Sequence, residues 1–142
     1  MYFDHVQLVT KRFDRLTQWY IKNLGFEITR EWAIQDLLPN FRIANLERGG
    51  VKLEIAGDGA MMKEAVFGTN IMEDQMIPGY RHIGIRVNNV DQIIYELTIK
   101  NIEIPFPPTN IHAAGIRTAF VHDCDRNIIE FVQPLDQIKF FC

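Results

Sequence analysis

The chain has 142 residues, of which 47% are hydrophobic and 23% are charged, with a formal net charge of −3. This length suits one ordinary domain, and the acidic balance argues against a nucleic-acid-binding surface, which needs an excess of basic residues. No apolar stretch approaches the roughly 20 residues of a membrane span, and we expect no secretory signal at the N-terminus. Cys124 and Cys142 are too few for a disulfide scaffold. We interpret both as free thiols and expect a cytoplasmic enzyme or small-molecule-binding protein.

The first predicted elements are a strand over residues 5–9 and a helix over residues 14–24. Apolar and polar residues alternate in the strand, so His5 lies on the face opposite the apolar one. Asp14 is the expected N-cap of the helix, because a carboxylate there can accept a backbone N–H. Gly25 is the expected residue at the end of the helix, since glycine adopts the left-handed conformation easily.

Two further strand-like segments, 26–31 and 51–55, complete the first half of the chain. In the second of these, Glu54 lies on the face opposite the apolar side chains. A methionine-rich connector over residues 57–79 follows, and we expect a short helix within it at residues 61–66.

The second half of the chain repeats this order of elements, with an expected N-cap at Asp91. The corresponding segments are 82–86, 91–100, 103–106 and 128–132. His5 and Glu54 are 49 residues apart, and His82 and Glu130 are 48 residues apart. An internal repeat of this kind predicts two β-α-β-β-β modules. We therefore expect an α+β protein with one domain, divided into module one (about 1–58), a connector (57–79), module two (about 79–134) and a C-terminal tail (135–142).

His5, Glu54, His82 and Glu130 are the candidate chemical residues, because they occupy equivalent positions in the two modules. Each is predicted to point away from the helices. If the two sheets curve around one cleft, two imidazoles and two carboxylates converge, a donor set that suits a divalent transition metal. A single strand histidine is usually a structural residue and a single strand glutamate is usually solvated. It is the joint placement of all four that favours a metal site.

These residues lie within motifs that resemble the vicinal oxygen chelate superfamily, the group of glyoxalases, bleomycin resistance proteins and extradiol dioxygenases. The motifs are His5 with Trp19-Tyr20, Asn23–Phe26, Gly50–Glu54, Tyr80–Val87 and Asp123–Glu130. The resemblance implies paired βαβββ modules that form an open, cupped mixed sheet around a metal cleft. It also implies a homodimer, with the site built within one chain or across the subunits.

The order His, Glu, His, Glu is most similar to glyoxalase I. This resemblance implies one divalent ion (Ni, Zn, Fe, Co or Mn) that stabilises an enediolate, a small hemithioacetal-like substrate, and Glu130 as the base with Glu54 as its symmetry partner. One alternative is an Fe- or Mn-dependent extradiol-type dioxygenase or thiol transferase that uses only His5, His82 and Glu130. Another is a non-catalytic, bleomycin-resistance-like protein that binds a small ligand.

Two arginines are candidates for substrate binding. Arg86 lies two residues beyond His82 on the same predicted face, and Arg117 begins a predicted strand. A guanidinium matches the geometry of a carboxylate or phosphate. The other interpretation of Arg86 is a salt bridge with Glu54 or another carboxylate of the cleft.

The sequence also departs from the family at the turn before Glu130, which lacks the usual proline and glycine. Either Arg126 or Asn127 must therefore take up the strained backbone of this turn.

Overall fold

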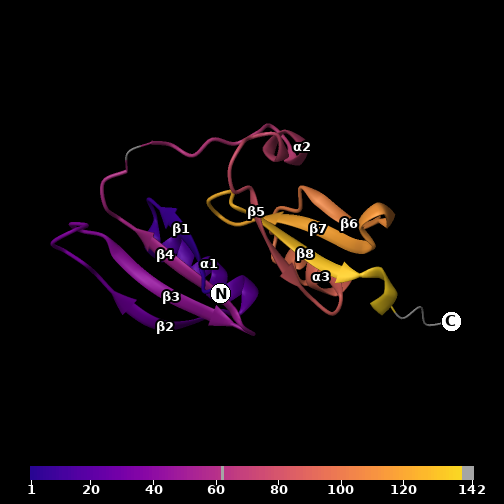
Figure 1. The fold of residues 1–142 in the computed structure, drawn as a ribbon, viewed down its shortest axis with the longest axis horizontal. Coiled ribbons are helices and arrows are strands. Elements are labelled where there is room, and N and C mark those ends of the chain that lie inside the picture. Colours follow the sequence, from indigo (N-terminus) through magenta and orange to yellow (C-terminus); the bar gives the residue numbers. More distant parts are fainter. Residues whose placement is uncertain (62, 139–142) are drawn as a thin grey trace. The chain divides into compact units, whose positions relative to one another are not determined.

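The computed structural model describes residues 1–61 and 63–138, which fall into two compact units, Met1–Ala65 and Val66–Cys142 (Figure 1). The first unit contains β1 (Val6–Thr10), α1 (Phe13–Leu24), β2 (Glu27–Trp32), β3 (Arg42–Arg48) and β4 (Val51–Gly57). The second contains α2 (Ile71–Gln75), β5 (His82–Arg86), α3 (Val90–Ile99), β6 (Phe106–Ile111), β7 (Ile116–His122) and β8 (Ile128–Pro134). Cys142 lies outside the described residues.

Each unit is built on a four-stranded mixed sheet. The strand orders are β1-β4-β3-β2 and β5-β8-β7-β6, so the two sheets have the same topology. In each sheet the first and last strands of the module pair in parallel, and the other neighbours pair antiparallel. This arrangement confirms the predicted α+β class and the paired βαβββ modules. The grouping of both modules into one domain with the stated bounds stays a prediction.

One face of each sheet is apolar and is covered by the helix of its own module, since α1 contacts β4, and α3 contacts β6, β7 and β8. The buried side chains of module one include Leu16, Tyr20, Leu24, Leu46, Leu53 and Ile55. Those of module two include Val90, Ile94, Leu97, Val121, Ile129 and Phe131. The period of two in the strands therefore leaves a second, more polar face in each module. No helix in the described part of the chain is long and apolar enough to cross a membrane.

The ends of the helices confirm one prediction and correct two others. Gly25 ends α1 with a φ of 67°, and its N–H donates to the carbonyl of Ile21, as expected. The predicted N-caps were wrong, because α1 begins at Phe13 and α3 begins at Val90. The cap of α3 is Asn89, whose side chain accepts the N–H of Gln92.

The two aspartates that were expected to cap the helices lie in the first turns of those helices instead. There each aspartate binds an arginine. Asp14 Oδ2 lies 3.0 Å from Arg42 Nη1. At the equivalent place in module two, Asp91 accepts hydrogen bonds from Arg117 Nε at 2.7 Å and Arg117 Nη2 at 2.6 Å. Each pair joins the helix of a module to its third strand.

We predict that Asp91→Asn makes the protein less stable at neutral pH by roughly 0.5–1 kcal/mol, a small value because water screens this partly exposed pair. The hydrogen bonds from Arg117 lower the pKa of the Asp91 carboxyl. A lowered pKa in the folded state contributes stability that is present above the unfolded-state pKa of about 3.9 and is lost as the pH falls through the folded-state value.

Urea unfolding across acidic and neutral pH measures this effect. The difference between Asp91→Asn and the wild type should shrink below about pH 4, whereas Asp36→Asn, an exposed control, should match the wild type throughout. A difference that stays constant with pH would show that the ion pair does not stabilise the fold.

The connector helix does not lie where it was predicted. Residues 63–66 contain no helix, and residue 62 is not described; the helix of the connector is α2. Its N-cap is Asn70, whose side chain accepts the N–H groups of Met72 and Glu73, both at 3.0 Å. The start of the helix is therefore set by a capping side chain, which a methionine cannot supply.

The turn that leads into β8 is held by Asp123. Its carboxylate accepts the backbone N–H of Asp125 at 2.8 Å and that of Asn127 at 2.9 Å. Arg126 adopts the left-handed conformation, with a φ of 66°. This confirms that one of the two candidate residues takes up the strain of the turn.

Candidate metal centre

His82 and Glu130 come together on the polar face of module two. They lie on the neighbouring parallel strands β5 and β8, where Gly84 is the register partner of Glu130. His82 Nε2 lies 3.2 Å from Glu130 Oε2. A Cβ atom at Gly84 would lie 3.6 Å from the same oxygen, an ordinary van der Waals distance, so Gly84 packs directly beside the carboxylate. The side chains of His82 and Glu130 are 30% and 15% exposed, so the pair is partly accessible.

Two residues that sequence reasoning missed hold this pair in place. Thr118 Oγ1 donates to Glu130 Oε1 at 2.7 Å, which orients the carboxylate. The ring of Phe120 packs edge-on against the His82 ring at a centroid distance of 5.3 Å. Both residues come from β7, whose register with β8 sets their positions. As a result, Glu130 presents one oxygen to Thr118 and the other to His82.

Glu54 lies on the equivalent face of module one, but different side chains surround it. Its carboxylate is nearly buried and accepts hydrogen bonds from Gln7 Nε2 at 2.6 Å and from Asn45 Nδ2 at 3.3 Å. Asn45 in turn accepts a hydrogen bond at 2.8 Å from the indole N–H of Trp32. Register explains these contacts, because Gln7 and Asn45 are the two cross-strand partners of Glu54.

His5 immediately precedes β1, and its side chain is 40% exposed. Its Nδ1 lies 2.7 Å from Asp4 Oδ1, and this hydrogen bond lowers the pKa of the Asp4 carboxyl. The structure therefore brings His5 to Asp4, whereas it brings Glu54 to two side-chain amides. Among the residues that the structure describes, no side chain bonds the other ring nitrogen of His5.

The two candidate substrate-binding arginines lie on opposite faces of module two. Arg86 is exposed and is the register partner of Val132, two residues along β8 from Glu130, so it shares the face of Glu130. Arg117 is the register partner of Gln133, which places it on the other face. There it binds Asp91 and donates to Asn110 Oδ1 at 2.8 Å. These contacts favour a role for Arg117 in fixing α3.

The predicted donor set matches a divalent transition metal in chemical type, since imidazole nitrogen and carboxylate oxygen are ligands of Zn and its neighbours. Each module contributes one histidine and one glutamate of the set. Within the residues that the structure describes, no three His, Cys, Asp or Glu side chains are gathered closely enough to hold an ion. His82 and Glu130 are the pair that is already assembled.

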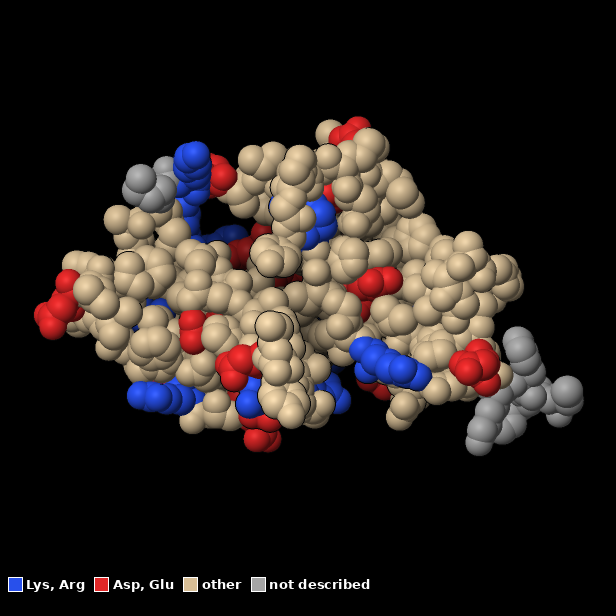
Figure 2. Space-filling view, viewed as in Figure 1, with Lys and Arg blue, Asp and Glu red and all other residues tan. Residues whose placement is uncertain are grey.

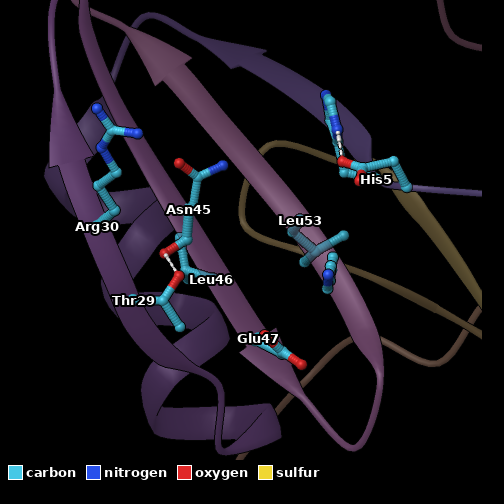
Figure 3. Close-up of a pocket in the computed structure, with 9 residues that line it drawn as sticks. His5, Thr29, Arg30, Asn45, Leu46, Glu47 and Leu53 are labelled. Atoms are coloured by element: carbon cyan, nitrogen blue, oxygen red, sulfur yellow. Dashed lines mark hydrogen bonds and ion pairs between the residues drawn. The ribbon is translucent and has the colours of Figure 1, made fainter.

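A pocket of about 360 Å³ lies in module one (Figure 3). Its lining consists of Asp4, His5, Thr29, Arg30, Asn45, Leu46, Glu47, Lys52 and Leu53. The pocket therefore reaches from His5 to Asn45, the residue that bonds Glu54. On the face of the molecule drawn in Figure 2, acidic and basic side chains are interspersed.

Comparison with solved structures supports the fold. The structure of SMU.1112c is 24% identical, with a TM-score of 0.74, over 94% of this chain and 98% of that one. A glyoxalase I mutant from Zea mays is 19% identical, with a TM-score of 0.71, over 91% of this chain and 43% of that one. The fosfomycin resistance protein FosX from Listeria monocytogenes is 14% identical, with a TM-score of 0.67, over 95% of each chain.

No curated protein matches the sequence. The family model described as Glyoxalase/Bleomycin resistance protein/Dioxygenase superfamily matches residues 2–131, which is nearly the whole chain. The repeated modules and the shared topology of the solved structures agree with this match. The chain belongs to the Glyoxalase/Bleomycin resistance protein/Dioxygenase superfamily.

Proposed function

We propose that the protein is a metal-dependent lyase or isomerase with glyoxalase I-like chemistry, which moves a proton between two carbons of a small oxygenated substrate. The observation that carries the proposal is the His82–Glu130 pair at 3.2 Å, together with Thr118 on the second carboxylate oxygen. A carboxylate that is oriented but not fully enclosed is suited to proton transfer, because it can reach a substrate atom without losing its support.

The proposed metal ligands are His5, Glu54, His82 and Glu130. A divalent ion bound by these residues would supply a Lewis acid that polarises the oxygens of the substrate. In a hemithioacetal-like substrate, Glu130 would accept the proton from the carbon that carries the sulfur. It would then return the proton to the neighbouring carbon. The product is an isomer of the substrate, so no oxidant is consumed. Arg86, on the face of Glu130, would contact an anionic part of the substrate.

A specific observation supports a second candidate, an Fe- or Mn-dependent dioxygenase or thiol transferase that uses His5, His82 and Glu130. Both oxygens of Glu54 already accept hydrogen bonds from Gln7 and Asn45. A glutamate satisfied in this way can serve the fold without a metal. In that case the loss of the Glu54 charge would leave metal binding and activity largely intact.

The third candidate is a small-ligand-binding protein without catalysis, as in the bleomycin resistance branch of the resemblance. We expect a cytoplasmic homodimer for all three candidates. Light scattering on the purified chain measures the dimer directly, and a monomeric mass would contradict this expectation.

The experiment that tests the leading proposal is an isomerisation assay in deuterated water. The substrate is the hemithioacetal of methylglyoxal with a small thiol, and Ni, Zn, Co, Fe and Mn are added separately. We expect a 2-hydroxy thioester as the product, which is detected by NMR. The same spectra report any deuterium that the solvent has delivered to C2 of this product. Absence of the thioester with every metal would overturn the proposal. Oxygen uptake with catechols, measured on the same samples, would favour the dioxygenase.

A further inference from the structure

We propose that the pocket of module one binds the carboxylate group of a small molecule, and that Arg30 and Lys52 recognise this group. The proposal rests on the proposed function and deepens it, because the pocket is lined by His5 and by Asn45, which bonds Glu54. It assigns a chemical class, a carboxylate-bearing molecule, to the substrate of that site.

Register places both cations on the face of the sheet that carries Glu54. Arg30 on β2 is the partner of Asn45 on β3, and Asn45 is the partner of Glu54 on β4. Lys52 precedes Glu54 by two residues on β4, so its side chain leaves the same face. In Figure 3 the Arg30 and Asn45 side chains rise from neighbouring strands, and His5 lies beyond them on the far side of β4. A ligand held by the two cations would thus lie beside the proposed metal ligands of module one.

The Arg30 guanidinium is supported but not neutralised. It lies 5.8 Å from the centroid of the Trp32 ring, and that indole is fixed by its hydrogen bond to Asn45. In the part of the chain that the structure describes, neither Arg30 nor Lys52 forms an ion pair with a carboxylate, taking 4.0 Å as the limit for the nitrogen–oxygen distance. A guanidinium on an aromatic face keeps its N–H fork free, and this fork matches a carboxylate with two parallel hydrogen bonds.

The remaining charges of the pocket favour a carboxylate over a phosphate. The lining holds two acidic residues, Asp4 and Glu47, beside the two basic ones. Glu47 is the register partner of Lys52, and Asp4 is bonded to His5. The charges of this lining nearly cancel, so the net attraction for an anion is modest and grows only in proportion to its charge. The cost of removing the anion from water grows with the square of its charge, so a group with one negative charge is favoured over a dianion. A volume of about 360 Å³ also lies within the range of small-molecule sites.

An NMR titration of the ¹⁵N-labelled full chain tests the proposal with two probes of equal shape, butyrate and its uncharged amide, butyramide. Butyrate should shift the backbone amide signals of Arg30, Asn45 and Lys52. Its dissociation constant should be well below that of butyramide. Arg30→Gln and Lys52→Gln should each weaken butyrate binding by about tenfold, the effect of losing one charge-assisted contact. Arg30→Lys should restore part of it, and Lys63→Gln, an exposed control outside the pocket, should bind as the wild type does.

Equal binding of butyrate and butyramide, or unchanged butyrate binding in Arg30→Gln, would overturn the proposal. Tighter binding of inorganic phosphate than of butyrate would overturn the choice of carboxylate. The titration is run on protein as purified and again after the metal has been removed by a chelator and dialysis. Butyrate binding is thus measured independently of the metal and of catalysis. A protein that bound no metal or lacked isomerase activity would contradict the proposed function, whereas a failed butyrate titration would contradict the carboxylate site alone.

Discussion

Glu130→Gln should reduce the isomerase activity by about a hundredfold to ten-thousandfold, the usual contribution of a positioned general base. The substitution keeps the shape of the side chain and removes its capacity to accept a proton. The hydrogen bond from Thr118 and the contact with His82 both rest on that carboxylate. The expected loss therefore appears in kcat, and deuterium gained at C2 of any product should fall with it.

The measurement is a kcat determination with each metal in excess, so that weakened metal binding does not account for the loss. Glu27→Gln is the matched control, since Glu27 is an exposed glutamate on β2 that is neither a proposed metal ligand nor a lining residue of the pocket of module one. Retention of more than about a third of the wild-type kcat by Glu130→Gln would be incompatible with a role as the base.

Leu16→Ala should lower the free energy of unfolding by roughly 2–5 kcal/mol, the range for a fully buried leucine. Leu16 has 0% exposure and lies in the core of module one. Its removal leaves a cavity beneath the sheet that carries Gln7 and Glu54, and the surrounding side chains relax into it only partly. We expect a lower midpoint in urea unfolding.

Leu37→Ala is the matched control for this substitution, because the Leu37 side chain is 76% exposed. It should change the free energy of unfolding by less than about 0.5 kcal/mol. A loss below about 1 kcal/mol for Leu16→Ala would show that α1 does not pack on the sheet as described.

The modules and their polar faces could be predicted because they depend on short-range patterns. A period of two in a strand places Glu54 and Glu130 opposite the apolar side chains whatever lies elsewhere in the chain. The internal repeat then identifies equivalent positions. Gly25 was predictable for the same reason, since the left-handed residue at a helix end is read from the helix itself.

Contacts that depend on register or on distant partners could not be predicted. Asp14 and Asp91 have the chemistry of N-caps, but Arg42 and Arg117 reach them from strands 28 and 26 residues away. The side-chain amides around Glu54 also depend on pairings of strands that the sequence does not specify.

The cross-strand register of β7 and β8 explains the face on which Arg117 lies. It faces α3 because it is the register partner of Gln133, and this pairing follows from the turn between β7 and β8.

The metal content of the purified protein, measured by mass spectrometry for the wild type, Glu54→Gln and Glu130→Gln, distinguishes a four-ligand site from a three-ligand one. The proposed four-ligand site predicts about one divalent ion per chain in the wild type and a clear loss in both variants. Glu27→Gln, the control on β2, should retain the ion. Loss in Glu130→Gln alone would contradict the four-ligand site and favour the three-ligand enzymes. A wild type that takes up no Ni, Zn, Co, Fe or Mn would contradict metal-dependent chemistry altogether.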